Sequence, residues 1–147
     1  MSSSQAEENF VKGVQALSNG HLYLALVCFE QAIQLERSPL CCSCLAFCLA
    51  KARGQFAEAV SLCEEALGKD PGNSVHYLNL GRVYILAGQR EKAINVFRQG
   101  LQFENADDIV RELVSLGTRK KPVIQSLNRE HPLNKICGIM MKKLGYR

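Results

Sequence analysis

Glycine and alanine recur in this sequence at a period of 34 residues, and that period constrains the fold more than any other feature. The glycines are Gly20, Gly54 and Gly88, and the alanines are Ala25, Ala59 and Ala93. Three copies in register predict three repeating units that begin near residues 6, 40 and 74. Because one such unit cannot bury its apolar face alone, we expect the units to stack on one another.

The third copy carries the fullest pattern, and the pattern has a mechanical reason. An aromatic-x-x-Leu-Gly-x-x-Tyr motif is followed by Ala-x-x-x-Phe; the residues are Tyr77, Leu80, Gly81, Tyr84, Ala93 and Phe97. Gly81 removes a side chain where a second helix crosses close to the first, and Phe97 fills the space between the two helices.

This motif and its period resemble the tetratricopeptide repeat, a helix-turn-helix unit of about 34 residues. The resemblance covers residues 6–107, as repeats at 6–39, 40–73 and 74–107. It implies an all-α fold in which the repeats stack as a right-handed superhelical solenoid. The middle repeat departs from it, with Phe47 where glycine is expected and Cys63 where phenylalanine is expected. We interpret this as an exchange of volume between facing helices.

Two further segments follow the repeats. A seventh helix, capped by Asn105 or Asp107, is predicted to reach Leu116, with Gly117 ending it. Residues 108–117 are therefore expected to cap the stack by packing on the third repeat, through Ile109, Val110, Leu113 and Val114. The extension 118–147 is predicted to hold a loop up to His131 and an eighth helix from Leu133 to about Leu144.

Composition favours a cytoplasmic protein without a membrane segment. No apolar run approaches the roughly 18 residues of a transmembrane helix. The N-terminus is polar and acidic, unlike a signal peptide. Seven cysteines, several of them adjacent or at helical spacing, suit a reducing compartment.

The charge is divided unevenly along the chain. Residues 1–117 have a net charge of −3, whereas residues 118–147 have a net charge of +7. A nucleic-acid-associated regulator acting through the basic tail is therefore an alternative function. No aromatic residue interleaves with these basic residues, however, so we expect a solvated face that pairs with the acidic body, and nucleic acid is not the favoured partner.

In the family that the sequence resembles, the first helix of each repeat lines a concave groove that binds a protein or peptide. The resemblance places ten residues in this groove: Phe10, Val14, Leu17, Cys44, Cys48, Lys51, Val75, Leu78, Arg82 and Ile85. Members that hold a chaperone's C-terminal carboxylates carry Lys, Asn and Arg at set positions. Those positions are Phe10, Val14, Leu45, Val75 and Asn79 here, so an apolar groove that takes an amphipathic helix is the better expectation.

The sequence gives little support for a catalytic site or a metal site. Cys41, Cys44 and Cys48 share one helical face, but without a fourth ligand or paired zinc spacing we predict no metal, and no cofactor. Three histidines, His21, His76 and His131, are scattered, so no Ser/His/Asp set is predicted.

We therefore expect an adaptor or assembly scaffold rather than an enzyme. The predicted helix Leu133–Leu144 is amphipathic, and we expect it to bury its apolar side in the groove. Docking within one chain makes it a built-in occupant, whereas docking between two chains makes a swapped homodimer. The remaining alternative is that this helix packs beside the cap and leaves the groove open for a partner.

Overall fold

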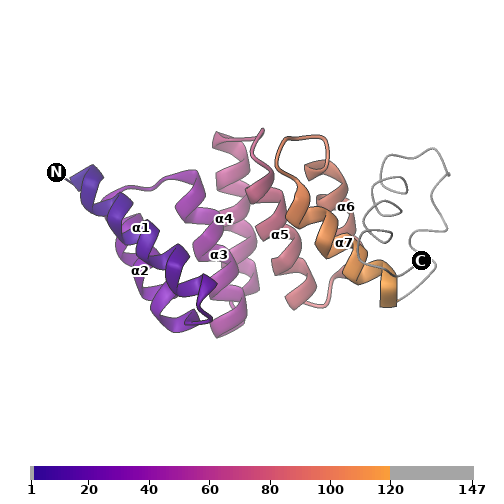
Figure 1. Cartoon of the computed structure of the whole chain (residues 1–147), viewed down its shortest axis with the longest axis horizontal. Coiled ribbons are helices and arrows are strands. Elements are labelled where there is room, and N and C mark those ends of the chain that lie inside the picture. The colour runs from indigo at the N-terminus through magenta and orange to yellow at the C-terminus, as the bar shows by residue number, and fades with distance from the viewer. Residues whose placement is uncertain (1, 120–147) are drawn as a thin grey trace.

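A computed structural model describes residues 2–119, and this part of the chain is a row of seven helices without a strand (Figure 1). The helices are α1 (Ser2–Ser18), α2 (Leu22–Leu35), α3 (Pro39–Arg53), α4 (Phe56–Lys69), α5 (Ser74–Leu86), α6 (Arg90–Gly100) and α7 (Asp107–Arg119). Consecutive helices pack in pairs, and each pair packs on the next. The predicted all-α fold is confirmed, whereas the predicted eighth helix lies outside the described residues.

Local sequence signals set most helix ends. Ser38 caps α3, because its Oγ accepts a hydrogen bond from the Cys41 backbone N–H at 3.2 Å, and Pro39 follows as the first helical residue. Asn73 caps α5 in the same way, through the Val75 N–H at 3.0 Å. The periodic glycines occupy the turn inside each pair, with φ between 66° and 79°; they are Gly20, Gly54 and Gly88.

Two helix ends differ from the sequence-based prediction. Helix α1 begins at Ser2 rather than near Gln5, and the Ser3 hydroxyl donates a hydrogen bond to Glu36 Oε2 at 3.2 Å. The prediction that Gly117 ends the seventh helix is wrong, because α7 continues to Arg119. Gly117 is buried, so the absence of a side chain there suits close packing rather than a stop.

A glycine facing a phenylalanine sets the separation of the helices in the first and third pairs. A Cβ atom placed on Gly81 would overlap the ring of Phe97, and one on Gly13 would lie 2.6 Å from the Phe29 ring. Both rings are completely buried. The rings therefore occupy the space that the glycines leave open, as the repeat pattern predicts.

The two ends of the stack are closed differently. At the C-terminal end, the four apolar residues predicted for α7 are all buried against α5 and α6, in one cluster with Leu78, Ala93 and Phe97. Arg90 Nη2 also donates to the Leu116 carbonyl at 2.9 Å. At the N-terminal end, Glu8 and Lys12 form an exposed ion pair at 2.8 Å. One repeat later these two positions are Cys42 and Ala46, which are buried.

We predict that Gly81→Ala destabilises the protein by about 1–3 kcal/mol, because the new methyl group must displace the buried Phe97 ring. Gly68→Ala, also within a helix, is the matched control. A Cβ there meets nothing within 4 Å, so this change should be neutral or stabilise by up to about 1 kcal/mol. Urea unfolding measures both. Equal effects of the two changes would contradict the close approach of α5 and α6.

Candidate functional site

The first helix of each pair, together with α7, contributes to one surface pocket of about 430 Å³. We call it the groove pocket; it is lined by Leu17 of α1, Phe47 and Lys51 of α3, Arg82, Ile85 and Leu86 of α5, and Glu112 of α7. Its walls therefore come from every inner helix of the stack. Leu86 is 41% exposed, so apolar surface is open to a ligand.

An aromatic ring between two cations marks the middle of the groove pocket. The Lys51 ammonium lies 5.6 Å from the centroid of the Phe47 ring, and the Arg82 guanidinium lies 5.5 Å from it. Arg82 Nε also donates to Glu112 Oε1 at 2.7 Å, so its charge is paired. Among residues 2–119, no carboxylate pairs with Lys51, and its side chain is exposed. The described part of the pocket thus offers apolar walls and the accessible positive charge of Lys51.

The structure divides the ten predicted groove residues into three groups. Four of them line the groove pocket, namely Leu17, Lys51, Arg82 and Ile85. Four lie elsewhere with partly or fully exposed side chains, namely Phe10, Val14, Cys44 and Val75. Cys48 and Leu78 are buried in the two hydrophobic cores, so their side chains hold the stack together and offer no surface to a ligand.

Sequence reasoning missed Phe47, Leu86 and Glu112. Phe47 lies where the other repeats have glycine, and the volume-exchange interpretation assigned it to the interior. The structure has the small Cys63 buried opposite that position, while the Phe47 ring remains partly exposed and extends into the groove pocket. Glu112 belongs to the cap, which lies outside the repeat register. The signal in the sequence that could have revealed the pocket was Phe47, a bulky residue at a position where the other repeats have glycine.

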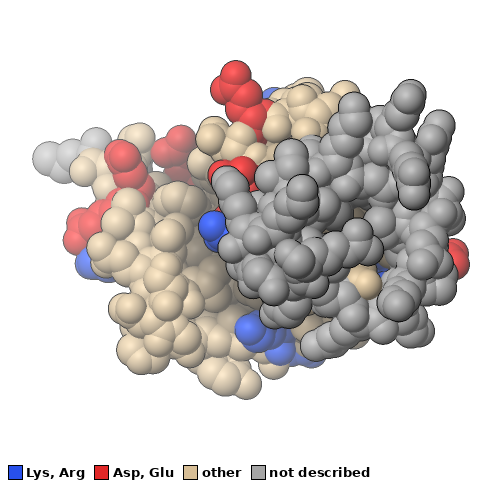
Figure 2. Space-filling model, turned by 45° about the vertical axis from the view of Figure 1, so that its right-hand side comes forward, with Lys and Arg blue, Asp and Glu red and all other residues tan. Residues whose placement is uncertain are grey.

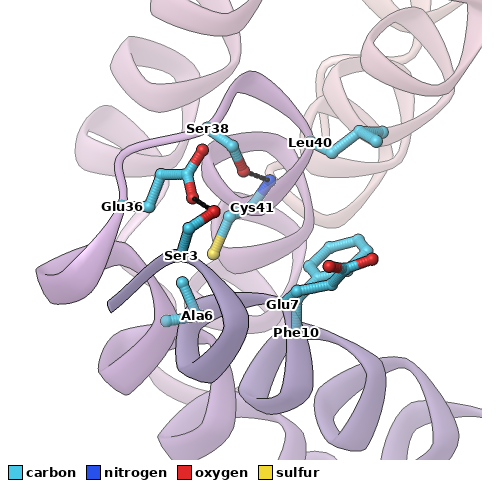
Figure 3. A pocket seen from close by; sticks show the side chains of 9 residues that line it. Ser3, Ala6, Glu7, Phe10, Glu36, Ser38, Leu40 and Cys41 are labelled. Atoms are coloured by element: carbon cyan, nitrogen blue, oxygen red, sulfur yellow. Dashed lines mark hydrogen bonds between the residues drawn. The ribbon is translucent and has the colours of Figure 1, made fainter. Parts of the chain in front are cut away.

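A second pocket, of about 300 Å³, lies where α1 faces the start of α3 (Figure 3). It is lined by Ser3, Ala6, Glu7, Phe10, Ala32, Glu36, Ser38, Leu40 and Cys41. Apolar side chains alternate here with two carboxylates, Glu7 and Glu36. This end of the inner face therefore suits a basic side chain, in contrast to the Lys51 end.

Three cysteines of α3, namely Cys41, Cys42 and Cys48, are buried, and Cys44 is partly exposed. Burial raises the pKa of Cys41 and Cys48 to about 12 and that of Cys44 to about 11. The Cys41 thiol also donates to the Phe29 carbonyl at 3.4 Å. Within residues 2–119, no group of three or more His, Cys, Asp or Glu residues is arranged to hold a metal ion. These cysteines act as small hydrophobic side chains in tight packing.

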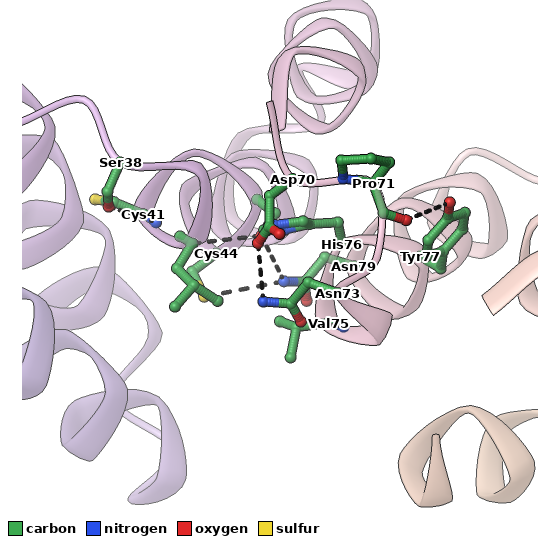
Figure 4. A network of polar contacts seen from close by, with 12 residues as sticks. Ser38, Cys41, Cys44, Asp70, Pro71, Asn73, Val75, His76, Tyr77 and Asn79 are labelled. Carbon is green, nitrogen blue, oxygen red and sulfur yellow. Dashed lines mark hydrogen bonds and ion pairs between the residues drawn. The ribbon is translucent and has the colours of Figure 1, made fainter. Parts of the chain in front are cut away.

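The structure does bring a serine, a histidine and an aspartate together, contrary to the prediction from sequence (Figure 4). His76 Nδ1 lies 2.8 Å from Ser43 Oγ, and His76 Nε2 lies 3.0 Å from Asp70 Oδ2. Asn79 Nδ2 donates to the same Ser43 oxygen at 3.3 Å. The three residues come from α3, the α4–α5 loop and α5, which are far apart in sequence.

Burial excludes a nucleophilic role for this serine. Both Ser43 and His76 have no exposed surface, so a substrate cannot reach the Ser43 oxygen. Neutral His76 with its proton on Nε2 donates to Asp70 and accepts from Ser43, which satisfies both ring nitrogens. The arrangement is a buried polar network that joins the second repeat to the third.

We predict that thiol reagents do not label Cys41 or Cys48 in the folded protein at pH 8, because both thiols are buried, the thiolate is the reactive form and the raised pKa suppresses it. Mass spectrometry after iodoacetamide treatment, with and without denaturant, tests this. The raised pKa also makes the free energy of unfolding fall as the pH rises from about 9 to about 12. In this range the unfolded chain has lost the thiol protons that the folded chain still holds. Rapid labelling of the folded protein would contradict the buried placement.

The stacked helix pairs define a helical-repeat protein. A model of the tetratricopeptide repeat family matches residues 50–116, and solved tetratricopeptide repeat domains have the same fold. Residues 50–116 are therefore similar to the tetratricopeptide repeat family, and the described helices have the fold of its solved domains. No curated protein matches its sequence significantly.

Two solved structures illustrate the likeness. The first tetratricopeptide repeat domain of Spaghetti (RPAP3), bound to the HSP90 peptide SRMEEVD, is 20% identical and has a TM-score of 0.65, covering 80% of this chain and 96% of that chain. The Arabidopsis OM64 tetratricopeptide repeat domain is 21% identical with a TM-score of 0.62, covering 77% and 97%. Among residues 2–119, no helix has the length and apolar character needed to cross a membrane.

Proposed function

We propose that this protein is a protein–protein interaction module that binds an amphipathic helix across its inner face, with the groove pocket as the anchor. The observation that carries the proposal is the lining of that pocket by α1, α3, α5 and α7 together. A ligand seated there contacts the whole stack, so its affinity depends on the repeats being correctly assembled. An adaptor or scaffold role follows from such binding.

The residues present favour an apolar anchor over a carboxylate ligand. The structure of Spaghetti contains an acidic HSP90 peptide, but four of the five carboxylate-binding positions of such domains are apolar in this chain. The fifth, Asn79, is buried and its amide is engaged with Ser43. A large apolar side chain beside Phe47 and an acidic side chain near Lys51 suit the groove pocket better.

The chain's own segment Leu133–Leu144 is the occupant that we propose for this site, although it lies outside the described residues. Its apolar residues recur at helical spacing and are Leu133, Ile136, Cys137, Ile139, Met140 and Leu144. Figure 2 shows acidic side chains toward the N-terminal end of the face in view as well as along its upper edge. Glu7 and Glu36 line the second pocket, between α1 and the start of α3. The lysines of the segment complement that end. A true partner then displaces the segment, whether it docks within one chain or between two.

We predict that ending the chain at Arg119 exposes the groove, because its built-in occupant is removed. The truncated protein should bind a hydrophobic dye more strongly and should melt at a lower temperature than the full chain. Dye fluorescence and thermal unfolding followed by circular dichroism measure the two effects. Unchanged dye binding and an unchanged melting temperature would show that residues 120–147 do not occupy the groove.

We predict that a labelled peptide of residues 131–147 binds the truncated protein and that Leu86→Glu weakens this binding at least about tenfold, because a charge replaces an apolar wall. Leu35→Glu is the matched control, since Leu35 on α2 is 44% exposed, close to the 41% of Leu86, but lies outside the pocket. Fluorescence anisotropy gives both affinities. Equal weakening by both changes, or none by either, would remove the pocket as the anchor.

A further inference from the structure

Helices α1 and α3 each contribute to both pockets of the inner face. On α1, Leu17 lines the groove pocket and Phe10 lines the second pocket. On α3, Phe47 lines the groove pocket and Leu40 lines the second pocket. Both pairs are seven residues apart in sequence. Because an α-helix rises about 1.5 Å per residue, about 10 Å of helix separates the two pockets on each side.

The residues between the two pockets are apolar, and the pockets themselves differ in charge. Val14 lies between them on α1 and is 41% exposed, and Cys44 lies between them on α3 and is partly exposed. The accessible charge at the groove pocket is the ammonium of Lys51, whereas Glu7 and Glu36 line the second pocket. A ligand that lies across both pockets therefore needs an apolar middle and a basic group at the second pocket.

Neither carboxylate of the second pocket has a cationic partner among residues 2–119. Glu36 Oε2 accepts a hydrogen bond from the Ser3 hydroxyl at 3.2 Å, but no lysine or arginine of the described chain forms an ion pair with Glu36 or Glu7. Phe10 and Leu40 add apolar surface beside them. This combination suits a lysine, whose methylene groups pack on apolar side chains while its ammonium reaches a carboxylate.

We propose that the second pocket receives Lys143, and that the C-terminal segment therefore docks antiparallel to α1 and α3. This inference rests on the proposed function, because it gives a direction and a register to the proposed occupant of the groove. Ile136 and Lys143 are seven residues apart, which is about two turns, so they share one side of the predicted helix. Leu17 and Phe10 have the same spacing on α1, so Ile136 at the groove pocket places Lys143 at the second pocket.

Charge favours this direction over the opposite one. Glu130 is the only acidic residue of 120–147, and it precedes the segment. The antiparallel direction brings Glu130 to the Lys51 end of the inner face and Lys143 to the acidic end. The opposite direction would bring Lys143 toward Lys51 and Glu130 toward the two carboxylates, so like charges would repel at both ends.

The place where the described chain ends favours the same direction. Helices α1, α3, α5 and α7 run the same way (Figure 1), and the groove pocket lies near their C-terminal ends, since Leu17 and Leu86 are within one residue of the ends of α1 and α5. Arg119 ends α7 at that edge, so the chain reaches the groove pocket first and the second pocket last. The residues 120–135 span up to roughly 50 Å when extended, which is enough for this path.

Carbodiimide cross-linking of the full chain tests the register, because the reagent joins a carboxylate only to an amine in contact with it. After proteolysis, mass spectrometry should recover Lys143 joined to Glu7 or Glu36. Recovery of Lys143 joined to Glu112 of the groove pocket would overturn the proposed direction, and so would the absence of any product between Lys143 and the second pocket.

The structure offers two internal controls for this experiment. Glu8 and Lys12 form an ion pair at 2.8 Å, so their product shows that the reagent has worked. Glu58 is an exposed carboxylate of α4 outside both pockets, so its products with Lys143 give the background from random encounters.

Charge reversal in the full chain gives a second test. Lys143→Glu should raise the fraction of chains with an open groove by about two- to tenfold, as hydrophobic-dye fluorescence measures, because a like-charge contact replaces an exposed ion pair. Adding Glu7→Lys should restore the original fluorescence. Lys120→Glu, which changes the tail charge equally, is the matched control and should have no such effect.

An equal rise for Lys120→Glu, or no rescue by Glu7→Lys, would remove the second pocket as the lysine site. Failure of the proposed function has a different signature, since the binding of peptide 131–147 would then not depend on Leu86 of the groove pocket.

Discussion

The contact between a glycine on one helix and a phenylalanine on the next is the constraint on which this structure depends. At Gly13 and Gly81 the backbone of the first helix lies directly against the ring of Phe29 or Phe97. A side chain on the glycine would push the paired helices apart, and a smaller residue than phenylalanine would leave a cavity. This contact fixes the separation of the helices in a pair, and therefore the direction in which the next pair packs.

The middle repeat does not have this glycine–phenylalanine contact, and it supplies Phe47, the aromatic residue of the groove pocket. With Cys63 small and buried, the facing position accommodates a large residue, and Phe47 has room for its Cβ without displacing a ring. The rest of its side chain then extends to the inner face, between Lys51 and Arg82. One exchange of large and small residues thus preserves the helix packing and supplies the aromatic surface of the groove pocket.

The fold was predictable because its determinants are local and periodic. Turn glycines, the Ser38 cap and the apolar set of α7 each act within a few residues, and the 34-residue period placed the turn glycines in register. The site was less predictable, because helical spacing alone does not separate a groove residue from an adjacent core residue. Cys48 and Leu78 share the inner side of their helices with accessible neighbours, yet both are buried, Cys48 in the core of the first two repeats and Leu78 in the cluster with α6 and α7. Only the packing angle of the repeats decides which side chains remain open.

The buried polar network could not be predicted from the sequence either, because its residues are far apart along the chain. The network explains why the groove pocket has a defined shape. Apolar packing between repeats is not directional and tolerates small shifts. The bonds from Ser43 to His76 and from His76 to Asp70 are directional, and leaving buried Ser43 or His76 unpaired costs about 1–3 kcal/mol. They fix α3 against α5, the two helices that supply Phe47, Lys51, Arg82, Ile85 and Leu86. Between the first and second repeats the positions that correspond to Ser43 and His76 are Asn9 and Cys42. Asn9 Oδ1 accepts a hydrogen bond from Gln5 on its own helix, and within residues 2–119 no such network joins Asn9 to Cys42. The repeat interface that carries the anchor is therefore the one whose register the sequence specifies most strictly.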